Sequence, residues 1–175
     1  MPLRRRMRPG AGKAKGASFE RFVCKQLSLW VSKGEREDIF WRSAMSGGRA
    51  TVQRGKGKRN ATQVGDISAV DPMGAWLINH FAVECKVYRD LEIDKFIIKG
   101  TGKLAEFWRE TEQLVVLPRE PLLIAKQNGL PVFILVTAGG IAKLQLEGEY
   151  RLWSTGLIAL YRFEALQSAC LSGPL

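Results

Sequence analysis

Two charged residues, Glu84 and Lys86, lie in an otherwise apolar stretch of the chain that has the character of a β-strand. Successive side chains of a strand point to opposite faces, so Glu84 and Lys86 would share one face while Cys85 points to the other. Charges in an apolar strand are unfavourable unless they are paired with each other or bind a metal ion. A salt bridge near the end of the strand and a metal site therefore explain the pair equally well.

A third charged residue, Asp66, favours the metal site. Asp66 follows Gly65 at the start of a short β-like segment, and we expect a hairpin that returns alongside Glu84. The two carboxylates could then share one divalent cation, and such hard oxygen ligands suit Mg²⁺ or Mn²⁺ rather than zinc. Glu84-Cys85-Lys86 is also the only place in the chain where an acidic residue stands two positions before a lysine.

The hydrophobic periodicity predicts an α/β fold in which a mixed β-sheet is flanked by helices. Apolar residues at helical spacing indicate a first helix from Ser18, its expected N-cap, to about Gly34, and a second amphipathic helix over 102–116. The strands that we expect lie at 38–44, 65–70, 75–88, 121–125, 131–137, 141–146 and 157–161, and a short helix at 164–169 follows them. Turns are expected at 71–74 and at Asn128-Gly129.

The positive charge of the chain lies in its first third. The net charge is +10, but residues 1–62 contain 16 Lys or Arg and 4 Asp or Glu, and the rest of the chain is slightly acidic. We expect a flexible basic arm over 1–16 and a single domain over 17–175 that carries a basic loop at 46–62. This distribution favours a surface that binds a polyanion, although a solvated tail and a charged loop would have the same composition.

Several classes of protein are disfavoured by the composition. No stretch is apolar over the roughly 20 residues of a membrane helix, the N-terminus lacks a secretion signal, and we expect a cytoplasmic protein. Cys24, Cys85 and Cys170 are widely spaced, and with the single His80 they form no zinc pattern. We expect these cysteines to be buried thiols, and His80 to be structural, because it would lie ~13 Å along the strand from Glu84.

These motifs resemble the PD-(D/E)XK nuclease superfamily, whose core pattern is an acidic residue on one strand and (D/E)-x-K on the next. The chain is most similar to the archaeal and phage Holliday junction resolvases over residues 15–137. The additional motifs that carry the similarity are Lys15-Gly16, Glu20-Arg21, Arg42 and Ser46-Gly47. Gly65 stands where the superfamily pattern has its proline, and the segment after Leu146 has no counterpart in the resolvases.

The resemblance implies a restriction-endonuclease-like fold and a metal-dependent DNA endonuclease of the resolvase type, working as a homodimer on branched DNA in a bacterial, archaeal or phage-infected cell. The catalytic positions would be Glu20, Asp66, Glu84 and Lys86. The metal ligands would be Asp66, Glu84, the backbone carbonyl of Cys85, and Glu20 directly or through water, with Mg²⁺ or alternatively Mn²⁺ as the only cofactor. The residues expected to bind DNA are Arg42, Ser46, Arg49, Arg54, Lys56, Lys58 and Arg59.

Three alternatives stay open at the level of the sequence. A restriction-like or recombination-associated phage endonuclease would have the same active-site residues. A catalytically inactive DNA-binding protein of the same fold would use the same basic segments. In a basic structural or ribosome-associated protein, Glu84 and Lys86 would form only a salt bridge.

Overall fold

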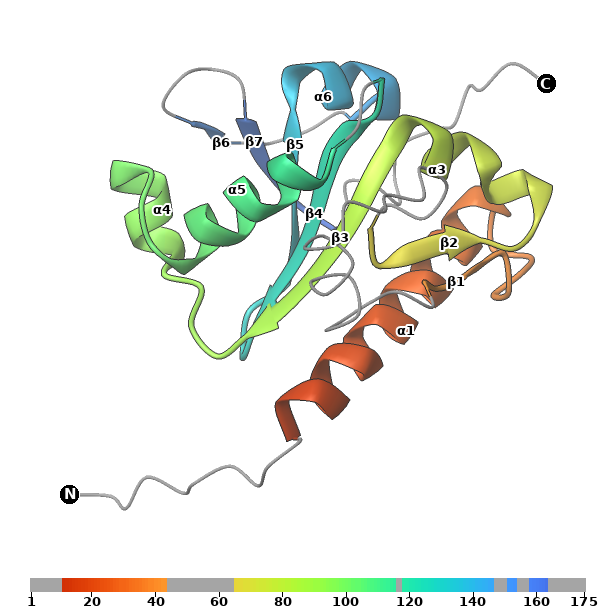
Figure 1. Ribbon diagram of the computed structural model, residues 1–175, viewed down its shortest axis with the longest axis horizontal. Helices are drawn as coiled ribbons and strands as arrows, with labels where there is room; N and C mark the ends of the chain where they lie inside the picture. The colour runs from red at the N-terminus through yellow and green to blue at the C-terminus, as the bar shows by residue number, and fades with distance from the viewer. Residues whose placement is uncertain (1–10, 44–64, 116–117, 147–150, 154–157, 164–175) are drawn as a thin grey trace, which may run out of the picture.

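The computed structural model describes residues 11–43, 65–115, 118–146, 151–153 and 158–163. The expected basic loop at 46–62 and the expected helix at 164–169 lie outside these residues. Within them the structure confirms an α/β architecture in which helices flank a mixed β-sheet (Figure 1). No helix of the described part of the chain is long and apolar enough to cross a membrane.

Five strands form the main sheet in the order β3-β4-β5-β7-β6. Their bounds are β3 (Phe81–Tyr88), β4 (Glu120–Gln127), β5 (Val132–Thr137), β6 (Arg151–Trp153) and β7 (Ile158–Arg162). Strands β3 and β4 pair in parallel, and the other neighbours pair antiparallel. The hairpin between β4 and β5 confirms the turn expected at Asn128-Gly129, whereas β6 was not expected from the sequence.

Helix α1 (Ala11–Val31) covers one face of the sheet, and it begins seven residues before the expected start. Ser18 lies inside α1 and is exposed, so the prediction that it is the N-cap is wrong. Residues 11–16 of the expected flexible arm are helical, which fits the helix propensity of their alanines and lysines. One face of α1 packs Phe19 and Leu27 into the larger hydrophobic core, against Val83 and Ile124 of the sheet.

Two helices cover the opposite face, as Figure 1 shows for α4 (Ile93–Lys99) and α5 (Lys103–Leu114). Helix α5 confirms the second expected helix, and α4 was not expected. Their buried residues, among them Phe96 and Trp108, form a second core with Leu123 and Leu135 of the sheet. The main sheet is therefore the middle layer of three, and the two faces of β4 belong to different cores.

A second, two-stranded sheet lies beside the main one, made of β1 (Phe40–Arg42) and β2 (Ile67–Ala69). Both strands were expected, and both are shorter than their predicted segments. The hydroxyl of Ser28 in α1 accepts hydrogen bonds from the backbone amides of Ile39 (3.1 Å) and Phe40 (3.0 Å). These two hydrogen bonds to the buried serine hold the start of β1 against α1.

Two segments that were expected to be strands are helical. The long strand expected over 75–88 is divided into α3 (Ala75–His80) and β3, after the short 3₁₀ helix η1 (Pro72–Gly74). His80 has a structural contact, because its Nδ1 lies 2.8 Å from the carbonyl oxygen of Trp76 one helical turn earlier. The strand expected over 141–146 is α6 (Ala138–Leu144), whose N-cap Thr137 accepts a hydrogen bond from the amide of Gly140.

Candidate active site

Strand β3 brings Glu84 and Lys86 together on the face of the sheet that α5 covers. The Lys86 ammonium lies 2.9 Å from Oε1 of Glu84, and Glu84 is only 9% exposed. Lys86 also lies 3.6 Å from a carboxylate oxygen of Glu110 on α5, and 5.4 Å from the ring centre of Phe107. The strand alternation therefore holds as expected, with Cys85 buried in the core on the α1 side.

Asp66 reaches β3 through its own backbone. Gly65 and Val83 form a parallel β-bridge, and the Asp66 amide donates a 2.8 Å hydrogen bond to the Val83 carbonyl oxygen. The Cys85 amide in turn donates a 2.9 Å hydrogen bond to Oδ2 of Asp66. The expected hairpin is wrong, because η1 and α3 intervene and the approach is a parallel bridge, but the predicted neighbourhood of Asp66 and Glu84 is correct.

Gly65 permits this close approach for a steric reason. Its φ of +96° lies in the region that favours glycine, and a Cβ at this position would stand 2.4 Å from the Val83 carbonyl oxygen. A proline could not occupy the position, because its ring fixes φ near −65°. The glycine is therefore a structural requirement of this site.

The proximity of the acids changes how Asp66 titrates. Burial first, and then the negative charge of Glu84, raise the pKa of Asp66 from 3.8 to about 7, although the Cys85 amide opposes the shift. Burial lowers the pKa of Lys86, but the charge and hydrogen bond of Glu84 outweigh it, and the net pKa of Lys86 is raised. Lys86 is therefore firmly cationic, while Asp66 is poised to lose its proton near neutral pH.

The donor set of this site fits a hard divalent cation. Oδ2 of Asp66 is hydrogen-bonded to the Cys85 amide and Oε1 of Glu84 is paired with Lys86, and no described residue donates to the second oxygen of either carboxylate. The N–H and C=O groups of one strand residue point to the same edge, so the Cys85 carbonyl faces Asp66 rather than β4. Two carboxylate oxygens and one carbonyl oxygen are ligands that Mg²⁺ accepts.

The surroundings of Glu20 differ from those of Asp66 and Glu84. It lies on α1, where Nε of Arg42 is 2.5 Å from its Oε2, and its charge contributes to the raised pKa of Asp66. Within the described ranges no three His, Cys, Asp or Glu side chains form a cluster that could hold a metal ion. Glu20 is therefore near Asp66 but paired with Arg42, and its role as a metal ligand stays a prediction.

Of the residues expected to bind DNA, the structure describes Arg42, which lies at the end of β1. The others lie outside the described residues: Ser46, Arg49, Arg54, Lys56, Lys58 and Arg59.

Cys24 and Cys85 are buried free thiols, as expected, and burial raises the pKa of Cys24 to about 12. Cys170 lies outside the described residues.

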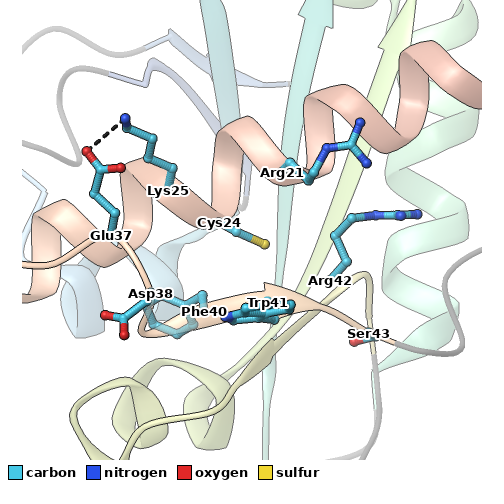
Figure 2. Close-up of a pocket in the computed structure, with 9 residues that line it drawn as sticks. All are labelled: Arg21, Cys24, Lys25, Glu37, Asp38, Phe40, Trp41, Arg42 and Ser43. Carbon is cyan, nitrogen blue, oxygen red and sulfur yellow. Dashed lines mark ion pairs between the residues drawn. The ribbon is translucent and has the colours of Figure 1, made fainter.

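Two features of the site were missed at the level of the sequence. One is the contact of Glu110 and Phe107 with Lys86, because the spacing of α5 gave no sign of what lies opposite it. The other is a pocket of about 670 Å³ between α1 and β1 (Figure 2). The charged and aromatic residues that line it include Arg21, Lys25, Glu37, Asp38, Trp41 and Arg42. The adjacent aromatic residues Phe40 and Trp41, with charged residues on both sides, were a signal that could have indicated it.

Comparison with known proteins gives one family. No curated protein and no solved structure matches the chain significantly. The model of the family described as "Phage putative PDDEXK endonuclease" matches residues 11–152, which is most of the chain. The matched range contains Asp66, Glu84 and Lys86 in the arrangement described above. The chain therefore belongs to this phage PD-(D/E)XK endonuclease family.

Proposed function

We propose that the protein is a Mg²⁺-dependent DNA endonuclease, with Mn²⁺ as an alternative cofactor. The observation that carries the proposal is the pair of buried carboxylates, Asp66 and Glu84, each with one oxygen unbonded among the described residues and with Lys86 beside them. Such a pair is unfavourable without a cation, because burial and like charge both oppose ionisation. Membership of an endonuclease family supplies the reaction class.

Each residue of the site would have a separate role in phosphodiester hydrolysis. Asp66, Glu84 and the Cys85 carbonyl would hold the cation, which when bound neutralises phosphate oxygens and lowers the pKa of a coordinated water. Lys86 is cationic, so it would orient the attacking water and stabilise the charge that develops on the phosphate. The ion pair with Glu84 keeps the ammonium at this position. Glu20 would act directly or through water, and Arg42 would contact the cleaved strand.

The finer proposal concerns the substrate. The resemblance to Holliday junction resolvases at Lys15-Gly16, Glu20-Arg21, Arg42 and Ser46-Gly47 supports cleavage of branched DNA. A junction has two symmetry-related strands to cut, so this substrate calls for a twofold homodimer. The basic excess of residues 1–62 would provide affinity for phosphates that carries little sequence information.

One substrate panel tests the proposal. Purified protein is incubated with a four-way junction, linear duplex or single-stranded DNA, in Mg²⁺, Mn²⁺ or EDTA. We expect metal-dependent cleavage, with symmetrical nicks in the junction. General degradation would keep the nuclease and overturn the junction specificity, and binding without cleavage would favour an inactive DNA-binding protein.

Single substitutions test the site itself. Asp66→Asn and Lys86→Ala should each lower the cleavage rate by a factor of about 100 or more, because each removes a group that acts on the transition state. Their affinity for DNA in EDTA should stay close to that of the wild type. Lys95→Ala is a matched control, since it removes a lysine from an exposed ion pair on α4 and should cleave normally. Metal-dependent cleavage at the wild-type rate by either site variant would overturn the assignment.

A further inference from the structure

Trp41 is a large exposed aromatic residue that lines the pocket between α1 and β1. Its side chain is 62% exposed although it lies in the middle of β1, between buried Phe40 and partly buried Arg42. Figure 2 shows the indole lying along the strand, under α1 and at the pocket between them. An exposed tryptophan in a pocket is a flat apolar surface available for stacking.

The charges around this pocket favour an anion. Lys25 is paired with Glu37 at 2.7 Å, and Asp38 is paired with Arg36 at 2.9 Å, so the two acids at one end are each neutralised by a cation. At the other end Figure 2 draws the guanidinium groups of Arg21 and Arg42 toward the same side. Arg42 is paired with Glu20, whereas no described residue forms an ion pair with Arg21.

The pocket is connected to the active site by a short path. Ser43 follows Arg42 in the chain, and its amide donates a 2.8 Å hydrogen bond to the backbone carbonyl oxygen of Asp66. Trp41 is two residues from Ser43, which corresponds to ~7 Å along an extended strand. That length is close to the separation of neighbouring phosphates in an extended nucleic-acid strand. A DNA strand at Asp66 would therefore bring an adjacent nucleotide to Trp41.

We infer that this pocket binds one unpaired nucleotide of the DNA substrate beside the cleaved phosphate, with the base stacked on Trp41 and a backbone phosphate on Arg21. This inference rests on the proposed function and specifies its substrate. A paired base offers no free face to an aromatic side chain, so stacking requires a nucleotide that is unpaired or turned out of the duplex. The volume of about 670 Å³ lies within the ~300–1,000 Å³ range of small-ligand pockets.

Binding in EDTA tests this inference without depending on cleavage. Fluorescence anisotropy gives the Kd for a labelled duplex, for the same duplex with one unpaired nucleotide, and for the same strand with an abasic residue at that position. We expect the wild type to bind the unpaired nucleotide roughly tenfold more tightly than either of the others, as one stacked base would give. Trp41→Ala should bind all three alike, and Trp41→Phe should keep most of the preference.

Two further variants complete the design. Arg21→Ala should weaken binding of the unpaired-nucleotide duplex and make its salt dependence shallower by roughly 0.7 to 0.9 in slope, as loss of one phosphate contact predicts. Ile98→Ala, which truncates an apolar residue on α4 that is even more exposed than Trp41, should match the wild type. Circular dichroism and sedimentation of each variant show whether its fold and oligomeric state are unchanged.

The outcomes separate this inference from the proposed function. If Trp41→Ala keeps the tenfold preference, or weakens all three substrates equally, the nucleotide pocket is wrong while the nuclease stands. If Trp41→Ala instead alters the oligomeric state and leaves the preference intact, Trp41 belongs to an interface between copies of the chain, and the inference is also wrong. If the wild type never cleaves in Mg²⁺ but shows the preference, the pocket stands and the nuclease fails.

Discussion

At the scale of single residues, the defining feature is that Asp66 and Glu84 are both about 9% exposed and lie close enough to repel each other. Glu84 is compensated by Lys86 at 2.9 Å. Asp66 accepts a hydrogen bond from the Cys85 amide. Without a cation, its carboxylate is protonated over much of the pH range below neutral. In the metal-free protein, burial and the charge of Glu84 therefore make the ionised form of Asp66 unfavourable in the folded state.

This unfavourable ionisation predicts how the stability of the metal-free protein depends on pH. The folded pKa of Asp66, about 7, lies above the unfolded value of 3.8, so the folded state binds more protons between about pH 4 and 7. The contribution of Asp66 to stability is fully present below pH 4 and is lost as the pH rises through 7. We expect metal-free Asp66→Asn to be more stable than the wild type at pH 8, by an amount on the order of a few kcal/mol, and the difference to shrink toward pH 5.

Urea unfolding in EDTA at pH 5 and pH 8 measures the difference. The comparison with the variant isolates Asp66 from other acids, such as Asp38 and Asp71, whose pKa values are lowered by their hydrogen bonds. Added Mg²⁺ should stabilise the wild type at pH 8 and have little effect on Asp66→Asn. Equal stabilisation of both proteins by Mg²⁺ would mean that Asp66 does not hold the cation.

Gly65 gives a second prediction at this scale. Gly65→Ala should lower the free energy of unfolding by about 2 kcal/mol or more and reduce cleavage, because the new Cβ would meet the Val83 carbonyl oxygen and φ is +96°. Gly129→Ala is the matched control, since Gly129 has a φ of +76° but no neighbouring atom within 4 Å. The control should lose only about 1 kcal/mol and cleave normally. A Gly65→Ala variant no less stable than the control would show that the bridge to Val83 tolerates a side chain.

At the scale of elements, the active site depends on how α1 and β1 are joined. Ser28 is fully buried, donates to the Cys24 carbonyl oxygen at 2.8 Å, and accepts from the amides of Ile39 and Phe40. Strand β1 then carries Arg42 to Glu20, and the amide of Ser43, the next residue, donates to the Asp66 carbonyl oxygen, so Ser28 aligns α1 with the strand that reaches both acids.

Ser28→Ala should therefore destabilise the protein by about 2–4 kcal/mol, because it leaves two buried amides without an acceptor. The midpoint and slope of urea unfolding measure the loss. Ser18→Ala is the control, since Ser18 is exposed inside α1 and alanine has the higher helix propensity, so its stability should be unchanged or slightly raised. Equal losses in the two variants would show that the hydrogen bonds of Ser28 do not account for its effect.

At the scale of the whole molecule, the charge is distributed unevenly. The basic excess of the chain lies in residues 1–62, whereas Asp66 and Glu84 lie beyond that range. Under the proposed function, the basic residues would give affinity for phosphates and the acids would give cleavage, so binding and cleavage would depend on different residues.

Deletion of residues 1–10, which contain four arginines, tests that separation. We expect weaker DNA binding and a shallower dependence of log Kd on log salt concentration, with kcat on saturating substrate unchanged. Replacing Arg4, Arg5, Arg6 and Arg8 by glutamine in the full chain should have the same effect. Unchanged salt dependence in both proteins would show that this segment does not contact DNA.

The sequence by itself determined the class of fold, the existence of the first long helix, and the placement of Glu84 and Lys86 on one face of a strand. These follow from short-range rules, since alternation along a strand places Glu84 and Lys86 together whatever surrounds them. It predicted α3 and α6 wrongly as strands, because short apolar segments fit both periods, and for α6 the difference came from a local hydrogen bond, the cap that Thr137 forms.

Only the tertiary structure decided how these residues meet. It replaced the expected hairpin with a parallel bridge through Gly65, placed Glu110 and Phe107 at Lys86, and held Glu20 against Arg42. None of these contacts has a signature in sequence spacing, because they join segments whose separation is set by the packing of whole helices on the sheet. The same packing opened the pocket beside Trp41, where the substrate specificity of Asp66, Glu84 and Lys86 can be tested.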